Sequence, residues 1–287
     1  MKLSVIIPCF NAANTIAVQL EALANQHWSK PWEVIVSDNA STDETVAIVE
    51  QYQEKLPNLR IIDSSDQGGA AHARNVGALS ATGDALLFCD ADDEVALGWL
   101  EAMGEALCKY DFVAGKREYN KLNEPWTLKY RTLSQLDGLQ EYNYPPFLPH
   151  ASASNLGVRR VIHEAIGGFD ETMQQLEDTD YCWRIQLAGT KLHFVPDAVV
   201  HYRLRDTIGG LYHQGRLWGE YNVLLYKKYR PLGMPKLSGK AGVRKWVRLL
   251  KRFPQVLSKE DRPGWVRKFA WRIGRLQGCI KYRVLAL

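Results

Sequence analysis

Acidic and small polar side chains follow the apolar runs in the first 100 residues of the sequence. In chain order they are Asn11, Asp38, Asn39, Ser64, Ser65, Asp66, Asp90, Asp92 and Asp93. A bare cluster of carboxylates repels itself and would also repel a phosphate ligand. A divalent cation removes both difficulties, because carboxylate and diphosphate oxygens together complete an octahedral Mg²⁺ or Mn²⁺ site. The pattern therefore predicts a divalent-cation site that also holds a diphosphate group.

The runs that must position these side chains are apolar throughout, which is typical of buried parallel strands. They are Leu3–Ile7, Glu33–Val36, Leu59–Ile62, Ala85–Cys89 and Phe112–Ala114. Helical segments separate them, among them residues 70–80 and a helix to about Tyr52 with Ser41 and Glu44 as its capping box. The alternation predicts an α/β fold with a mostly parallel sheet. Ligands of such sheets bind beyond the carboxyl ends of the strands, where the polar residues would gather.

The composition and the motifs exclude several classes of protein. The sequence has neither a GxGxxG motif after its first strand nor a GxxxxGK[ST] motif, so it supports no Rossmann dinucleotide site and no P-loop. Its five cysteines are widely scattered without a CxxC pair, which favours a reducing cytoplasm over a disulfide framework or a zinc site. We expect no signal peptide and no spanning helix, because no stretch approaches roughly 18 uninterrupted apolar residues.

Five short motifs occur in order along the chain. They are Ser4-Val-Ile-Ile-Pro8-Cys-Phe10-Asn11, Val36-Ser-Asp38-Asn-Ala-Ser41-Thr-Asp43, Ala73-Arg74-Asn75-Val-Gly77, Asp90-Ala-Asp92-Asp93, and Gly167-Gly-Phe169-Asp170-Glu171 with Glu177-Asp178. Together they resemble the family-two inverting glycosyltransferases of GT-A fold. A clear Gln-x-x-Arg-Trp motif is missing, and Tyr181-Cys-Trp183-Arg184 follows the acidic pair instead. This departure argues against a polymerising, membrane-channel synthase and for a non-processive enzyme.

The resemblance implies a nucleotide-sugar site at the first four strands. Its residues would be Pro8, Phe10, Asn11, Asp38, Arg74 and Asp90. The backbone of residues 8–11 would line the base, and Asp38 would accept a hydrogen bond from the imide of a uracil-like base. Arg74 would supply positive charge near the base and phosphates. Asp90 would hold the ribose or a metal-bound water. The donor would thus be a nucleotide diphosphate sugar, with UDP-sugars favoured.

The resemblance also implies the residues of the chemical step. Asp92 would ligate the Mn²⁺ or Mg²⁺ ion directly, and His201 would complete its shell. Asp178 would be the catalytic base that takes the proton of the acceptor hydroxyl. A structural interpretation stands beside each of these roles. Asp178 could be a helix N-cap, His201 a structural histidine, and Asp38 and Asp43 turn and capping residues.

The charge is divided unevenly along the chain. Residues 236–287 hold 15 Lys and Arg against Glu260 and Asp261, a net charge of +13, whereas residues 1–235 carry −9. Two stripes of apolar side chains lie in this basic segment, one around Trp246 and one around Trp265. Basic helices with aromatic edges suit an anionic membrane surface, although both stripes could instead pack on the catalytic domain. Nucleic-acid binding is not expected, because the catalytic part is acidic and no nucleic-acid-binding module is present.

These patterns predict a GT-A-like catalytic domain over residues 1–235 and a basic amphipathic helical segment over residues 236–287. Residues 1–115 would form the nucleotide-binding half and residues 116–235 the acceptor-side half, with an irregular flap at residues 116–150. The predicted function is inverting glycosyl transfer to a carbohydrate or lipid-linked acceptor at the cytoplasmic face of the cell membrane, in cell-surface polysaccharide or glycolipid synthesis. A sugar nucleotidyltransferase and a catalytically silent, membrane-recruited scaffold are the alternatives.

Overall fold

The computed structural model describes residues 1–129 and 133–286 and divides the chain into two compact units. The first comprises Met1–Leu122, Ser134–Gln140 and Pro149–Arg203, and the second Asn123–Leu133, Glu141–Leu148 and Leu204–Leu287. The expected boundary between residues 235 and 236 falls inside the second unit. A helix over residues 208–229 packs there on a helix over residues 262–281. The expected flap over residues 116–150 is shared between the units, and its residues 130–132 lie outside the described residues.

The first unit contains a mixed sheet in the order β3-β2-β1-β4-β7-β6-β8-β5. Its strands are β1 (Leu3–Cys9), β2 (Trp32–Asp38), β3 (Leu59–Asp63), β4 (Ala85–Phe88), β5 (Glu94–Val95), β6 (Phe112–Glu118), β7 (Leu156–Arg159) and β8 (His193–His201). Strands β1 to β4 are parallel to one another, and β6 is parallel to β8. Strand β7 runs antiparallel to β4 and β6, and β5 runs antiparallel to β8. The expected α/β class with a mostly parallel sheet is confirmed.

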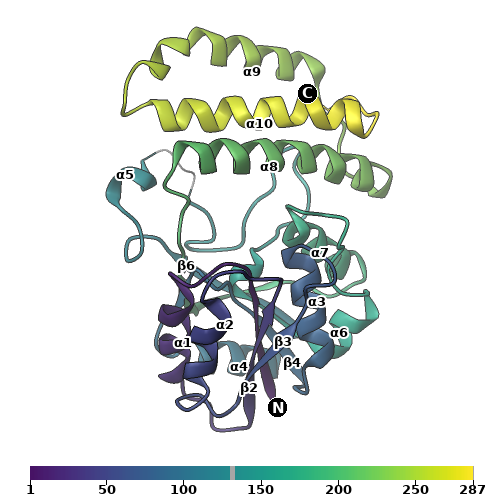
Figure 1. Ribbon diagram of the computed structural model, residues 1–287. Coiled ribbons are helices and arrows are strands. Elements are labelled where there is room, and N and C mark those ends of the chain that lie inside the picture. Colours follow the sequence, from purple (N-terminus) through teal and green to yellow (C-terminus); the bar gives the residue numbers. More distant parts are fainter. Residues whose placement is uncertain (130–132, 287) are drawn as a thin grey trace. The chain divides into compact units, whose positions relative to one another are not determined.

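Helices cover both faces of this sheet (Figure 1). Helices α1 (Ile16–Ala24), α2 (Thr45–Tyr52) and α4 (Trp99–Lys109) share a core with Val5 and Ile7 of β1. Helices α3 (Ala70–Ser80), α6 (Arg160–Ala165) and α7 (Glu177–Leu187) pack with Ile6 of the same strand on the opposite face. Successive side chains of a strand point to opposite faces. Burial on both sides therefore explains why the strands read as continuous apolar runs.

Strand β8 differs from the expectation of two separate strands near residues 192–195 and 198–202. It is one strand, and its pairing with β6 shifts register between Gly115 and Lys116. Gly115 pairs with Val195, whereas Lys116 pairs with Val199. Pro196 lies in the skipped segment, and proline has no N–H group to donate to a ladder.

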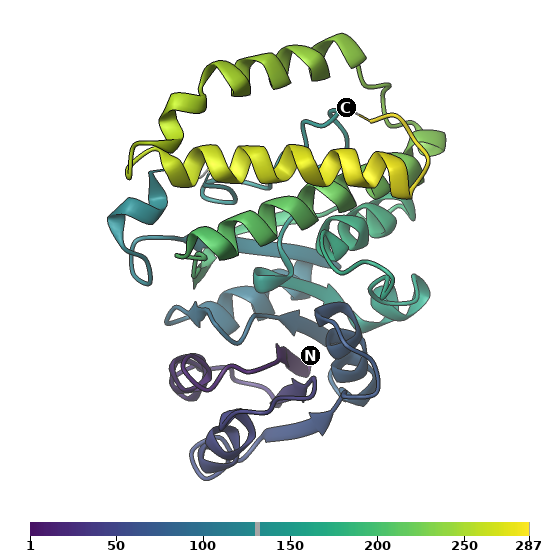
Figure 2. The same ribbon diagram turned by 45° about the horizontal axis from the view of Figure 1, so that its top comes forward.

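The second unit is built from long helices. They are α8 (Ile208–Tyr229), α9 (Gly239–Lys251) and α10 (Arg262–Lys281), with the short helix α5 (Pro125–Leu128) and the 3₁₀ turns η2 (Arg230–Leu232) and η3 (Phe253–Val256). Helices α8 and α10 lie side by side, and α9 lies on the other side of α10 (Figures 1 and 2). No helix within residues 1–129 and 133–286 has the length and hydropathy needed to span a membrane.

Glycines permit the close approach of α8 and α10. A Cβ atom on Gly274 would overlap the carbonyl oxygen of Arg216, and one on Gly219 would overlap that of Trp271. Small residues spaced four apart let two helix backbones come this near. Helix α10 forms the C-terminal half of the basic segment over residues 236–287. The apolar stripe around Trp265 therefore belongs to a helix that already packs on α8.

Candidate active site

Three carboxylates gather in the turn between β4 and β5. The ligating oxygens of Asp90, Asp92 and Asp93 all lie within 4.8 Å of one another. Asp93 is buried, and its Oδ1 accepts a hydrogen bond from the Arg203 amide at 2.8 Å. Its Oδ2 is also buried and has no hydrogen-bond partner among the described residues. Burial raises the pKa of Asp93 well above its ordinary value, and the charges of Asp92 and Asp90 raise it further. The donor set therefore fits a hard divalent cation, which would relieve this repulsion.

Arg74 of α3 connects this turn to α7. Its Nη2 donates to Asp90 Oδ1 and its Nη1 to Glu177 Oε1, both at 2.8 Å. The residue is 5% exposed. Burial alone would lower the pKa of Arg74, but the two carboxylates raise it above its ordinary value. Both terminal nitrogens of Arg74, which is expected to supply positive charge near the base and phosphates, thus contact carboxylates inside the protein.

Asp178 lies in the first turn of α7, directly after the Arg74 partner Glu177. The N-cap position is occupied by Leu176, in a left-handed conformation with φ of 61°. Asp178 is therefore not the helix N-cap that the structural alternative required. Its Oδ1 accepts the amide hydrogen of the adjacent Thr179 at 2.6 Å, and the residue is partly exposed. Leu176, a non-glycine residue with a positive φ, carries backbone strain of the kind that is often found at functional sites.

The loops after β1 and β2 are fastened to each other. The Asn11 amide donates to Ser41 Oγ at 2.9 Å, and Asn11 Oδ1 accepts from the Thr42 amide at 2.8 Å. The predicted capping box is therefore wrong: Ser41 holds the β1 loop, and α2 begins only at Thr45. Asp43 accepts the Thr45 amide hydrogen at 3.1 Å, which fits its interpretation as a turn residue, while the N-cap of α2 is Glu44.

The expected base-binding residues meet at the carboxyl ends of β1 and β2. Cys9 pairs with Asp38 in the sheet register, so its chain neighbours Pro8 and Phe10 lie near the end of β2. Asp38 Oδ2 accepts from the Ser41 amide at 3.2 Å, and its Oδ1 has no partner within the described parts of the chain. Phe10 is 61% exposed, which is high for an aromatic residue directly after a core strand. The geometry thus offers an accessible ring and an acceptor at one place.

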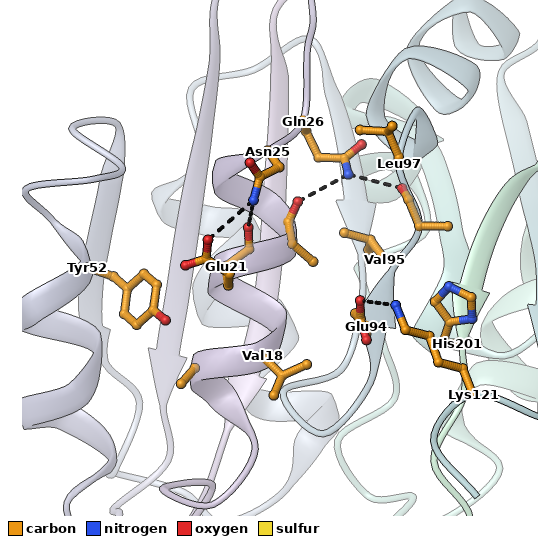
Figure 3. A pocket seen from close by; sticks show the side chains of 13 residues that line it. Val18, Glu21, Asn25, Gln26, Tyr52, Glu94, Val95, Leu97, Lys121 and His201 are labelled. Carbon is orange, nitrogen blue, oxygen red and sulfur yellow. Dashed lines mark hydrogen bonds and ion pairs between the residues drawn. The ribbon is translucent and has the colours of Figure 1, made fainter.

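His201 lies at the end of β8, outside the group of three carboxylates that the described residues form. Its Nδ1 is 2.8 Å from Glu118 Oε2. Burial would raise the pKa of Glu118, but the contact with His201 and two backbone amides lower it to about 2. His201 also lines a cavity of about 520 Å³ between α1 and β5, beside the ion pair of Glu94 and Lys121 (Figure 3). Asp92 and Asp178 are not among the residues that line this cavity.

Arg117 of β6 is a buried cation near the candidate site, and the sequence alone does not single it out. The side chain is buried, donates from Nη2 to Ser154 Oγ at 3.0 Å, and lies 3.9 Å from the Tyr202 ring centroid. Burial would lower the pKa of Arg117, whereas Tyr202, Asp93 and Asp178 raise it. One buried cation thus interacts with both the acidic turn and the first turn of α7. One feature of the sequence could have predicted its burial: Arg117 lies on the same strand face as Val113 and Gly115.

The first unit thus combines a mostly parallel sheet, an acidic turn and a carboxylate at a helix start. The family model "Glycosyl transferase family 2" matches residues 4–167, and the chain belongs to this family. The protein is therefore a glycosyltransferase. The sugar nucleotidyltransferase and the catalytically silent scaffold, considered as alternatives from the sequence, are set aside.

Known proteins of this kind resemble the chain in sequence and in structure. Glycosyltransferase AglE of Haloferax volcanii is 29% identical over 251 residues, covering 85% of this chain and 74% of AglE. TarS of Staphylococcus aureus, a poly(ribitol-phosphate) β-N-acetylglucosaminyltransferase, is 42% identical over 97 residues, 33% of this chain but 17% of TarS. The matched region thus spans a small part of TarS.

Two solved structures share the fold. TarS 1–349 in complex with UDP-GlcNAc superposes with a TM-score of 0.57 at 21% identity, covering 99% of this chain and 92% of that one. The mannosyltransferase PcManGT of Pyrobaculum calidifontis, in complex with GDP-Man and Mn²⁺, gives a TM-score of 0.66 at 18% identity over 97% and 87% of the chains. The chain has the GT-A fold with a C-terminal helical extension.

Proposed function

We propose that the protein transfers a sugar from a nucleotide diphosphate sugar to an acceptor hydroxyl in a single displacement with inversion at the anomeric carbon. The observation that carries this proposal is the chain of contacts from Asp90 through Arg74 to Glu177. It couples the acidic turn, suited to a metal and a diphosphate, to the residue that precedes Asp178. Among the described residues of the site, Glu177 is paired with Arg74 and the aspartates of the turn are assigned to the metal and ribose, which leaves Asp178 as the base of a single displacement.

The nucleotide would lie at the carboxyl ends of β1 and β2. Asp38 has an oxygen without a partner among the described residues, which supports its role as acceptor for a base imide. Phe10 offers a ring for stacking, and the backbone of Pro8 and Asn11 lines the same place. A uracil base suits this set because its imide donates a hydrogen, so UDP-sugars are favoured.

The acidic turn would hold a divalent cation. Asp92 would ligate it directly, and Asp90 would hold the ribose or a metal-bound water. The carboxylate of Glu118 at His201 Nδ1 is the kind of contact that orients a ligating imidazole, which supports His201 as a further ligand. Mn²⁺ or Mg²⁺, when bound, supplies charge stabilisation to the leaving diphosphate. Arg74 contributes by fixing the Asp90 carboxylate rather than by touching the phosphates.

Asp178 would act as the general base. A hydroxyl is a poor nucleophile at neutral pH, and a positioned carboxylate that takes its proton contributes about 10²–10⁴ in rate. Thr179 and Glu177 fix the backbone on either side of Asp178, so its carboxylate is held at the start of a rigid helix. The proton of the acceptor hydroxyl moves to the Asp178 carboxylate as the new glycosidic bond forms.

The donor can be found by a screen of nucleotide sugars with Mn²⁺, scored by the nucleotide diphosphate that is released. We expect release with one or a few UDP-sugars and none with the metal chelated. Release that is equally fast in excess chelator would contradict the metal requirement. Release of UMP together with a sugar 1-phosphate instead would contradict glycosyl transfer.

Membrane attachment would bring the enzyme to a carbohydrate or lipid-linked acceptor at the cytoplasmic face, in polysaccharide or glycolipid synthesis. Helix α9 and the turn after it carry an exposed apolar stripe of Val243, Val247, Leu250, Phe253 and Leu257. Exposed cations flank it at Arg244, Arg248, Lys251 and Arg252. The stripe of α10 is less available, because Trp265 is buried and contacts Phe253 and Phe269. The structure therefore favours α9 as the membrane-facing helix.

Substitutions in α9 test this attachment better than deletion of residues 236–287, which would uncover the α8 surface that α10 covers. Val247→Ser with Leu250→Ser should abolish sedimentation with anionic vesicles, and high salt should weaken the binding of the unaltered protein. Unchanged sedimentation of the variant would contradict the assignment. Leu232→Ser, exposed in η2, is a matched control.

A further inference from the structure

Three cationic side chains gather around Tyr144 in the second unit. Lys245 Nζ from α9 lies 3.7 Å from the centroid of the Tyr144 ring and donates to its hydroxyl. Arg275 from α10 has its Cζ 5.7 Å from the same ring and 4.8 Å from the ring of Trp271. Arg272, one residue after Trp271, has its Cζ 6.0 Å from that indole. We refer to Lys245, Arg272 and Arg275 as the Tyr144 cluster.

Arg275 is buried, whereas Lys245 and Arg272 are partly exposed, and no member has a carboxylate partner among the described residues. Arg275 is 3% exposed, and its Nη2 donates to the Ala286 carbonyl. Its Nη1, like Nε of Arg272, is buried and has no hydrogen-bond partner in the part of the chain that the structure describes. Burial lowers the pKa of both Arg272 and Arg275, which reflects the cost of charge held away from water. Buried polar groups are nearly always paired, so such groups call for a missing partner.

Two carboxylates of this unit form ion pairs with cations outside the cluster. Glu220 pairs with Lys281 at 2.7 Å and with Arg216 at 3.6 Å. Glu260 pairs with Lys129 at 3.2 Å. Across residues 1–129 and 133–286, no carboxylate forms an ion pair with a member of the Tyr144 cluster. The described residues therefore provide no counter-charge for the cluster, which leaves its donors free for an external anion.

A phosphate group fits this set of donors. The planar guanidinium presents parallel N–H groups that match two phosphate oxygens, and a lysine adds a point charge. Lys245 belongs to α9, whose exposed stripe we assign to the membrane, so a phosphate at this place would belong to a lipid. We propose that the Tyr144 cluster binds the phosphate of an anionic lipid headgroup, an inference that rests on the membrane attachment proposed above.

The first test compares variants with equal loss of charge. Lys245→Gln and Arg272→Gln each remove one cation from the cluster, and Lys259→Gln removes one from an exposed position outside it. With phosphatidylglycerol vesicles we expect the control to weaken sedimentation by about fivefold at most, the effect of about 1 kcal/mol for one surface cation. Each cluster variant should weaken it by more than tenfold. Equal losses in all three variants would overturn the site.

The second test separates a lipid headgroup from free phosphate. A short-chain phosphatidylglycerol, used below its micelle concentration, should raise the melting temperature of the full-length protein, and Arg272→Gln should abolish the rise. Inorganic phosphate at the same concentration should have little effect. A rise that is as large with inorganic phosphate would overturn the lipid assignment, and no rise with either would overturn the site.

UDP binding, measured by calorimetry on the same variants, keeps this inference apart from the proposed function. We expect unchanged UDP affinity in Lys245→Gln and Arg272→Gln, because the donor residues all belong to the other unit. Loss of UDP affinity together with loss of lipid binding would contradict a local headgroup site. The expected result is that both variants lose lipid binding but keep UDP binding. That result would leave the glycosyltransferase assignment unchanged.

Discussion

Arg74 Nη1 lies 2.8 Å from Glu177 Oε1, so a helix that packs on β1 holds the residue before the proposed base. The other terminal nitrogen of Arg74 holds Asp90 of the acidic turn. Burial raises the pKa of Glu177 and Asp178 raises it further, while Arg74 lowers it. Without the guanidinium, two neighbouring carboxylates and the acidic turn would face one another in a poorly hydrated place.

Arg74→Gln should therefore destabilise the first unit and slow transfer. Removing one partner of a buried ion pair costs about 3–5 kcal/mol, because the remaining charge stays buried. Chemical denaturation measures this loss. Lys55→Gln, which breaks the exposed pair with Glu21, is the matched control and should cost less than about 1 kcal/mol. Equal costs for the two variants would mean that Arg74 is not a structural link.

Asp92→Asn should abolish metal-dependent binding of UDP while the fold is retained. The amide keeps the size of the side chain but removes the charge that a hard cation needs. Calorimetry with UDP and Mn²⁺ measures the affinity. Asp197→Asn, at an exposed position of β8, should leave it unchanged. An unaltered affinity of Asp92→Asn would contradict the metal assignment.

His72 should make the attachment of the loop after β3 depend on pH. Its Nδ1 contacts Glu171 at 2.9 Å and its Nε2 contacts Asp66 at 2.8 Å. Burial alone would lower the pKa of His72, but the two carboxylates outweigh it and raise the pKa above the ordinary 6.5. A raised pKa in the folded state means that the stabilisation is complete below about pH 6.5 and is lost as the pH rises through the folded pKa. We expect the stability difference between the unaltered protein and His72→Gln to shrink from pH 6 to pH 9, and a difference independent of pH would refute this role.

The glycine contact of α8 and α10 should not accept a methyl group. Gly274→Ala forces the two backbones apart, and such overpacking costs about 1–3 kcal/mol or more. Gly209→Ala is the control, because a Cβ atom there meets open space near the start of α8. Alanine is the better helix former, so this change should be neutral or stabilising by up to about 1 kcal/mol. Thermal unfolding of both variants decides the matter, and a neutral Gly274→Ala would show that the helices can separate freely.

The elements that the sequence predicts well are those with strong local signals. Continuous apolar runs marked strands β1 to β4, and the segment predicted as a helix at residues 70–80 is α3. Thr207 and Pro231 bounded the long helix that is α8. These signals are local because burial on both faces, caps and proline each act within a few residues.

The features that escaped prediction depend on partners far along the chain. Arg117 is buried because it lies beneath Tyr202 and Asp93, neither of which is near in sequence. The hydrogen bond from Arg74 to Glu177 joins residues 103 positions apart. The burial of Arg74 therefore could not be predicted from the motif around it. The boundary near residue 204 follows from the packing of α8 on α10. For that contact a usable signal existed: Gly215 and Gly219 share the four-residue spacing of Gly274 and Gly278.

The central claim is that Asp178 takes the acceptor proton in an inverting displacement. The most direct measurement is NMR of the first product formed from the UDP-sugar identified in the donor screen, with the unaltered protein and Asp178→Asn compared at equal donor saturation. We predict a product whose anomeric configuration is opposite to that of the donor. We also predict that Asp178→Asn forms it about 10²–10⁴ times more slowly with unchanged donor affinity. A product that retains the donor configuration, or near-normal turnover of Asp178→Asn, would contradict the account.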